Sequence, residues 1–208
     1  MKLPLACTLA GDGAADRALR PVLEWFLGQL PLLQRRGFTV QVAAPGANLR
    51  DRLSRAVQEY PCDVLFVHRD AEREPREKRV EEIRRAVVAA GVPACVPVVP
   101  VRMTEAWLLI EEGAIRRAAG NPNGEVSLPL PRLTSLETVA DPKKLLRSCL
   151  IQASEKTGRR LEQFERDLPD RVQRVAELIS DFAPLRQLPA FRDFENEARE
   201  ALGQLPGS

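Results

Sequence analysis

The strongest strand signal in this chain is the stretch DVLFVH, residues 63–68. It is short, apolar and rich in β-branched residues, as is typical of a strand buried on both faces of a parallel sheet. Three further apolar runs predict strands over residues 3–10, 38–44 and 94–101. Two prolines in the last run remove backbone donors, so we expect this run at a sheet edge or at a bulge.

Segments with helical periodicity alternate with these runs. Apolar residues recur at helical spacing over residues 19–30 and 49–60, and residues 75–90 also read as a helix. Asp16 and Asn48 precede the first two segments, where helix caps are expected. The first hundred residues therefore predict an α/β fold, a mostly parallel sheet flanked by helices.

The second half of the chain has a different character. Residues 104–119 predict a helix with Thr104 as its cap, and residues 121–133 are rich in Pro, Asn and Gly, as loops are. From Asp141 onward the pattern is helical, with breaks expected at glycine and proline. We therefore expect an α/β core over residues 1–120, followed by a linker and a helical C-terminal extension over residues 121–208.

The composition bounds the class of protein. The chain has 208 residues, of which 44% are hydrophobic and 29% charged, as in globular proteins. The net charge of +2 predicts no strongly basic surface, although a local basic patch is compatible with it. Four widely spaced cysteines form no Cys-x-x-Cys pair, and no apolar stretch is long enough to span a bilayer. These features predict a soluble cytoplasmic protein without a membrane partner.

Acidic residues follow two of the predicted strands. Asp12 and Asp16 come after the first strand, and Asp70 and Glu72 come after the strand over residues 63–68. In an open parallel sheet these carboxylates collect at the carboxyl edge, where ligands bind. Carboxylates gathered in one crevice repel each other unless a cation lies between them, and hard oxygen ligands suit Mg²⁺ or Mn²⁺. Taken separately, each pair is also typical of a helix cap or a solvated loop.

The two acidic motifs resemble those of the Toprim (topoisomerase–primase) domain. In that family one strand ends in Glu-Gly-x-x-Asp and a later strand ends in Asp-x-Asp. Here DGAAD at residues 12–16 is similar to the first motif, with Asp in place of Glu, and DAE at residues 70–72 is similar to the second, with Glu in place of Asp. Each replacement keeps a carboxylate and changes its reach by one methylene. The fold that the resemblance implies is a Toprim-like sheet.

Most of the chain is similar to small bacterial Toprim-like proteins found in phage-defence loci beside ABC-type ATPases. This resemblance also rests on HRDAE at residues 68–72, on MTEAWL at residues 103–108 and on the helical tail. It implies a nuclease that depends on Mg²⁺ or Mn²⁺, acts on DNA or RNA and pairs with an ABC-type ATPase subunit. Asp12, Asp70 and Glu72 would be the catalytic and metal-binding residues, with Asp12 alternatively a general base. The rival interpretation is a binding or regulatory subunit without catalytic activity.

Other residues near these motifs have two interpretations each. Glu105 is a fourth candidate metal ligand, or a favourable charge in the first turn of a helix. Arg69 is a candidate phosphate-binding residue, or the partner of a nearby carboxylate, and Asp16 either supports the metal ligands or caps a helix. His68 is the sole histidine, which excludes paired-histidine zinc motifs, and its place at the end of a buried strand favours a structural role.

Three further features of the sequence bear on function. The chain contains no phosphate loop of the Gly-x-x-x-x-Gly-Lys-Ser/Thr type, so we expect no ATP hydrolysis by this chain alone. Trp107 is expected in the core rather than as a platform for base stacking. A locally basic stretch predicts either a plain charged surface or a contact with a nucleic-acid backbone. It contains Lys143, Lys144, Arg147, Lys156, Arg159 and Arg160.

Overall fold

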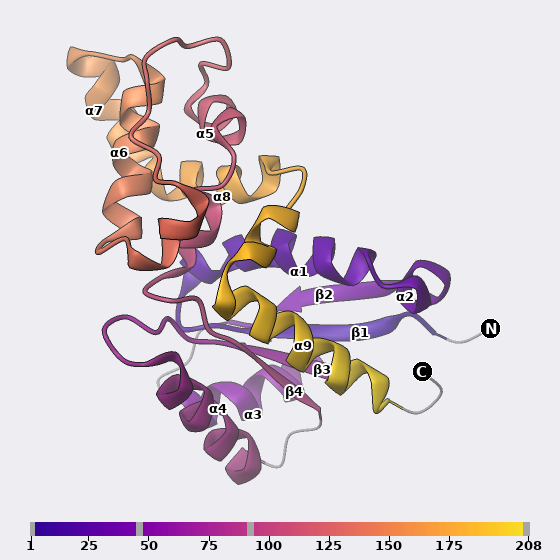
Figure 1. Ribbon diagram of the computed structural model, residues 1–208. Helices are drawn as coiled ribbons and strands as arrows, with labels where there is room; N and C mark the ends of the chain where they lie inside the picture. The colour runs from indigo at the N-terminus through magenta and orange to yellow at the C-terminus, as the bar shows by residue number, and fades with distance from the viewer. Residues whose placement is uncertain (1–2, 45–47, 91–93, 206–208) are drawn as a thin grey trace.

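The computed structural model describes residues 3–44, 48–90 and 94–205 (Figure 1). Its centre is a sheet of four parallel strands in the order β2-β1-β3-β4, which confirms the predicted α/β class. The strands are β1 (Leu5–Ala10), β2 (Phe38–Val42), β3 (Val64–His68) and β4 (Cys95–Val98). Every residue of β3 is buried, as its uninterrupted apolar sequence predicts.

Helices cover both faces of the sheet (Figure 1). Helices α1 (Leu19–Gly28) and α9 (Pro189–Gly203) lie on one face, and α3 (Leu49–Glu59) and α4 (Arg76–Ala90) lie on the other. Successive residues of a strand point to opposite faces. Phe66 accordingly packs in the core with α1 and α9, whereas its neighbours in β3 pack against α3 and α4.

The local signals at the element ends hold in most places. Asn48 caps α3, since its side chain accepts a hydrogen bond from the Asp51 backbone N–H at 3.0 Å. Strand β4, which contains Pro97, lies at an edge of the sheet as its prolines predict. Two short helices complete the core domain: the 3-10 helix η1 (Ala14–Ala18) lies between β1 and α1, and α2 (Pro31–Arg36) lies between α1 and β2.

The predicted helix over residues 104–119 is instead two elements. A buried 3-10 turn, η2 (Thr104–Leu108), is followed by a bend and then by α5 (Glu112–Ala119). Met103, not Thr104, is the residue before the first turn. The backbone N–H of Thr104 donates to the side chain of Asp70, so a contact distant in sequence fixes this turn.

Helices α5 to α8 pack together beyond the carboxyl edge of the sheet (Figure 1). The later elements of the chain are η3 (Leu133–Thr138), α6 (Pro142–Ser154), α7 (Gly158–Arg166), α8 (Leu168–Leu178) and η4 (Ala183–Gln187). The breaks expected at Pro169, Pro184 and Pro189 fall where new elements begin, since these prolines stand in the first turns of α8, η4 and α9, as Pro142 does in α6. Proline is favoured there because the first backbone N–H groups of a helix have no partner within it.

Helix α9 returns to the sheet and joins the two parts of the chain. The ring of Phe194 lies 5.2 Å from Phe26 of α1 and 6.3 Å from Phe66 of β3, and Phe191 lies 5.1 Å from Trp107. One apolar core therefore runs across residue 120, the expected boundary, and Trp107 is part of it. α5 meanwhile packs with α6 and α8 rather than on the sheet.

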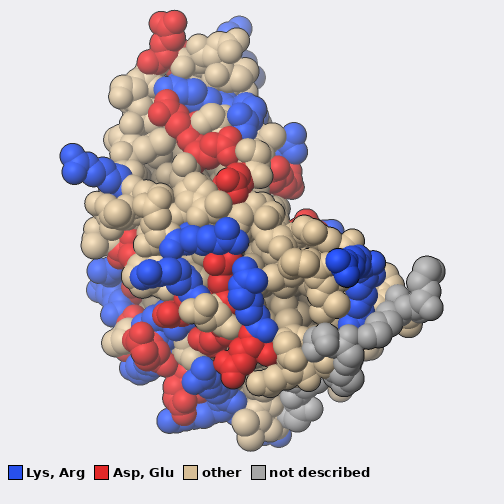
Figure 2. Space-filling model, turned by 45° about the vertical axis from the view of Figure 1, so that its right-hand side comes forward, with Lys and Arg blue, Asp and Glu red and all other residues tan. Residues whose placement is uncertain are grey.

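The surface carries charges of both signs. Figure 2 shows Lys and Arg side chains interspersed with Asp and Glu on the face in view. Such mixing agrees with a net charge of +2. Within the part of the chain that the structure describes, no helix is both long enough and apolar enough to cross a bilayer.

Candidate active site at the carboxyl edge of the sheet

The site lies where the chain changes direction across the sheet. The segment after β1 leads to β2 on one side of it, while β3 pairs with β1 on the other side. The loops after β1 and β3 therefore diverge, and ligands of open α/β sheets bind in the crevice so formed. Asp12 and Asp16 follow β1, Asp70 follows β3, and Glu105 of η2 follows β4 at the same edge.

His68 is the centre of the polar contacts at this edge. Its side chain is 1% exposed, and Nδ1 lies 2.9 Å from the Val98 carbonyl oxygen. Its Nε2 lies 3.2 Å from Thr104 Oγ1, 3.6 Å from Asp16 Oδ1 and 3.4 Å from Asp70 Oδ1. Burial lowers the pKa of His68, but the two carboxylates outweigh burial and the net pKa is raised.

Asp70 and Asp16 each accept further hydrogen bonds besides their contact with His68 Nε2. Asp70 Oδ1 accepts a hydrogen bond from the Thr104 backbone N–H at 2.9 Å and another from the Thr104 hydroxyl at 3.3 Å. Asp16 Oδ2 accepts from the Gly13 backbone N–H at 2.8 Å, so Asp16 does serve the start of a helix, namely η1. Gly11 leaves room for this carboxylate, because a Cβ there would collide with it.

Four carboxyl groups form a row along the edge. Burial raises the pKa of Asp16, and the charges of Asp70 and Asp12 raise it further. Burial also raises the pKa of Glu105, with the charge of Asp70 adding to the effect. Asp12, Asp16, Asp70 and Glu105 are thus neighbours in the electrostatic sense, and we call them the acidic row. Asp16 and Glu105 are its buried members, each 7% exposed.

Two arginines form ion pairs with the carboxylate of Asp12. The Arg52 guanidinium of α3 pairs with Asp12 Oδ1, and Arg69 Nε lies 3.5 Å from Asp12 Oδ2. Arg69 also donates to Glu82 at 2.8 Å. This contact agrees with the second interpretation of Arg69, as the partner of a nearby carboxylate. Arg52 is 7% exposed and was not singled out from the sequence, where it is one of several arginines in a helix with no local signal.

Glu72 lies outside the acidic row. Its backbone has a φ of 55°, in the left-handed region, and its N–H donates to the Arg102 carbonyl at 2.8 Å. The side chain is 64% exposed, and Oε2 lies 3.5 Å from Arg79. The charge of Asp70 acts on both Asp16 and Glu105, whereas Glu72 is not among the charges that act on either of them.

A divalent cation at this edge would need several oxygen donors around one point. Over residues 3–44, 48–90 and 94–205, no group of three His, Cys, Asp or Glu side chains is arranged to hold a metal ion. Mg²⁺, however, is usually bound by one or two carboxylates together with waters and substrate phosphates, not by a cage of protein ligands. The oxygen donors of Asp70, Asp16 and Glu105, two of them buried with raised pKa values, have the right chemistry for such a site.

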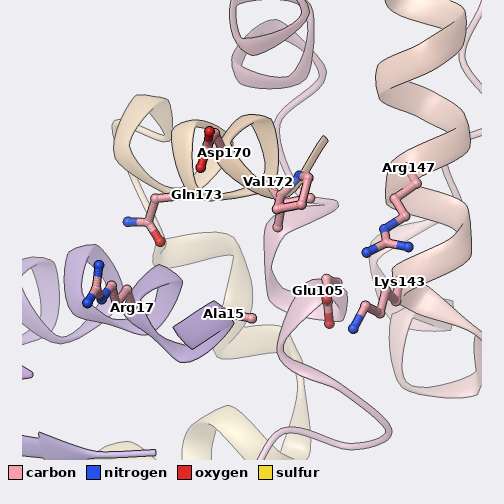
Figure 3. A pocket seen from close by; sticks show the side chains of 9 residues that line it. Ala15, Arg17, Glu105, Lys143, Arg147, Asp170, Val172 and Gln173 are labelled. Carbon is pink, nitrogen blue, oxygen red and sulfur yellow. The ribbon is translucent and has the colours of Figure 1, made fainter. Parts of the chain in front are cut away.

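A pocket of about 230 Å³ opens beside Glu105 (Figure 3). Lys143 and Arg147 of α6 extend toward Glu105, Arg17 of η1 lies on the opposite side, and α8 contributes Gln173. The basic stretch of the sequence is thus divided. Two of its members face this pocket, whereas Lys156 lies 5.0 Å over the ring of Phe164.

Comparisons with protein-family models, with curated proteins and with solved structures found no match to this chain. The case for a function therefore rests on the geometry of the acidic row and of the pocket beside it.

Proposed function

We propose that this protein is a divalent-metal-dependent nuclease whose site is the carboxyl edge of the sheet. The observation that carries the proposal is the acidic row, which lies at the change of direction of the sheet and borders a pocket with three basic side chains. Carboxylates beside basic groups are what a site for a metal ion and a phosphodiester requires. The Toprim-like sequence motifs support the same activity.

Asp70, with Asp16 and Glu105 beside it, would hold Mg²⁺ or Mn²⁺. When bound, the metal would polarise the phosphate and lower the pKa of a water molecule. His68 and Thr104 fix the orientation of Asp70 through the contacts described above. Glu105, whose pKa is raised by burial, is suited to accept a proton closer to neutral pH than an exposed carboxylate.

A specific observation favours the second candidate, a binding or regulatory subunit without catalytic activity. Asp12 is neutralised by Arg52 and Arg69, and Glu72 is turned outward toward Arg79. Two of the three residues that the sequence motifs predict to be catalytic are thus engaged by arginines of the same chain. In either case, the partner that we propose is an ABC-type ATPase subunit, with cytoplasmic DNA or RNA as the nucleic acid.

Cleavage assays with single substitutions separate the two candidates. Purified protein is incubated with Mg²⁺ or Mn²⁺ and with supercoiled plasmid, single-stranded DNA or RNA, with and without the ATPase partner. We expect cleavage that Asp70→Asn abolishes and that Glu74→Gln leaves unchanged. Glu74 is the matched control because it lies in the same loop, is exposed and pairs with Lys78. Circular dichroism verifies that both variants are folded.

A third variant tests the assignment of ligands. We expect Glu72→Gln to keep most of the activity, because Glu72 lies outside the acidic row. Loss of activity in Glu72→Gln, with Asp70→Asn also inactive, would instead support the set proposed from sequence: Asp12, Asp70 and Glu72. Failure to cleave any of the three nucleic acids, with the partner present, would refute the nuclease and leave the binding subunit.

A further inference from the structure

We propose that the pocket beside Glu105 binds the terminal phosphate of a nucleic-acid strand, so that the protein acts from phosphorylated ends. This inference deepens the proposed nuclease function and rests on it. The pocket lies between η1, η2, α6 and α8, and most of its wall comes from the helical part of the chain. It is therefore a feature that the acidic motifs do not themselves predict.

The basic side chains of this pocket have no carboxylate partner. Within the described residues, Arg17, Lys143 and Arg147 form no ion pair, whereas most other charged side chains around the sheet edge do. The Nε atom of Arg147 is buried and has no hydrogen-bond partner there.

Lys143 and Arg147 sit one helical turn apart on α6 and point the same way (Figure 3). Their charges act on Glu105, lowering its pKa against the larger effect of burial, without forming an ion pair with it. The space between them and Arg17 is the pocket itself. Arg17 lines the far wall with its guanidinium turned away, so two basic groups, Lys143 and Arg147, reach into this space from one side (Figure 3). Two unpaired cations beside an unfilled cavity are suited to hold an anion.

The charge of the pocket favours a terminal phosphate over an internal one. Arg17, Lys143 and Arg147 line the pocket together with two acidic residues, Glu105 and Asp170, so the basic groups are in excess. A terminal phosphomonoester carries a charge of about −1.5 to −2 at neutral pH, while each internal phosphodiester carries about −1. The dianion therefore gains more from this pocket than the monoanion does.

The size and position of the pocket agree with this ligand. A volume of about 230 Å³ is enough for a phosphate and part of its sugar, but far too small for a double helix, whose major groove alone is roughly 12 Å wide. Glu105 lines the pocket and is coupled to Asp70, so a bound strand end leads directly to the acidic row. The next phosphodiester along the strand would then lie at the site of hydrolysis.

Binding measured without metal tests this inference separately from catalysis. The probes are six-nucleotide DNA strands with a 5′-phosphate, a 3′-phosphate or hydroxyls at both ends, each with a fluorophore on a central base, in buffer with EDTA. We expect one phosphorylated probe to bind roughly tenfold more tightly than the unphosphorylated one, and inorganic phosphate to compete. In Lys143→Gln/Arg147→Gln this preference is expected to disappear.

The control is Lys144→Gln, at an exposed position of α6 that does not line the pocket; it removes one positive charge, whereas the double variant removes two. We expect it to keep the preference, and circular dichroism checks that all variants are folded. Equal affinity for the three probes, or a preference that survives in Lys143→Gln/Arg147→Gln, would overturn the inference.

The same probes keep the two proposals apart. If the protein cleaves nucleic acid but shows no preference for phosphorylated ends, the end-binding pocket is refuted and the nuclease stands. If the preference is present in the wild type and in Asp70→Asn, but no nucleic acid is ever cleaved, the nuclease is refuted and the pocket stands as a binding site.

Discussion

Replacing His68 with leucine tests whether this buried histidine holds the acidic row together. His68 Nε2 lies within 3.6 Å of an oxygen of both Asp16 and Asp70, and its other ring nitrogen contacts the Val98 carbonyl. Leucine fills much of the same space but supplies no donor. The Val98 carbonyl still accepts a hydrogen bond from the Arg69 N–H at 3.3 Å, so the loss falls on the two carboxylates.

The expected cost follows from the burial of those carboxylates. Removing one partner of a buried ion pair costs about 3–5 kcal/mol, because the other charge is left without compensation. The Asp16 side chain is 11% exposed and that of Asp70 is 31% exposed, so water relieves Asp70 more than Asp16. We therefore expect a loss at the lower end, about 3 kcal/mol, most of it from Asp16. Adding Asp16→Asn to His68→Leu removes the uncompensated charge and should restore about half of the loss.

Urea unfolding followed by circular dichroism, at several pH values, measures this loss. The pKa of His68 is raised in the folded protein, so its stabilising effect is complete below its ordinary pKa of 6.5 and is lost as the pH rises through the raised value. The contribution of His68 to the free energy of unfolding of the wild type should then fall as the pH rises above 6.5, and His68→Leu should lack that fall. A cost below about 1 kcal/mol at pH 6, or an equal cost in the Asp16→Asn background, would refute the reasoning.

Three further outcomes follow from the same contacts. Burial raises the pKa of Glu105, so the folded protein is destabilised by the charged form of this residue above that pKa. Glu105→Gln should therefore raise the melting temperature at pH 8 and not at pH 4. An equal effect at both pH values would contradict the burial argument. Thr104→Val removes the hydroxyl that donates to Asp70 but keeps the backbone N–H that also donates to it, so the free energy of unfolding measured in urea should fall by about 1 kcal/mol. Cleavage should also be reduced, because Asp70 is held less firmly. Phe194→Ala should cost about 3–5 kcal/mol in a single unfolding transition; two separate transitions would show that α9 is not part of the sheet core.

The fold class was predictable because the local composition of the strands indicates their place in the sheet. The run over residues 63–68 is buried on both faces, and its composition records that burial directly. The proline-containing run over residues 94–101 belongs to the edge strand for an equally local reason. The split of the helix over residues 104–119 was not predictable, because the backbone N–H of Thr104 is taken by Asp70, a residue 34 positions away.

The packing of α9 against the sheet also could not be predicted from the sequence. Its apolar stripe predicts that one face is buried, but a stripe does not say against what. The rings of Phe191 and Phe194 fit against Trp107, Phe26 and Phe66, which belong to three different elements. Such pairings depend on the assembled shape of the core and leave no periodic trace in any one segment.

Part of the candidate site could likewise be predicted from the sequence, and part could not. The place of Asp12, Asp16 and Asp70 at the carboxyl edge follows from the strand ends, and Glu105 follows from the next strand. Which of them face one another depends on partners that the motifs do not name. The left-handed backbone at Glu72 turns that side chain toward Arg79, and no glycine or proline marks the position in the sequence.

The buried arginine of α3 indicates how the two acidic motifs divide their tasks. Arg52 is 7% exposed, and a buried guanidinium requires a compensating charge, which Asp12 supplies. Asp12 therefore ties the loop after β1 to α3, and releasing it to bind a metal ion would leave Arg52 without its partner. Within the described residues, Asp70 and Glu105 have no arginine or lysine ion pair, and Glu105 lines the basic pocket. Chemistry at this edge should for that reason depend more on Asp70 and Glu105 than on Asp12, although the sequence motifs predict Asp12 as a catalytic residue alongside Asp70.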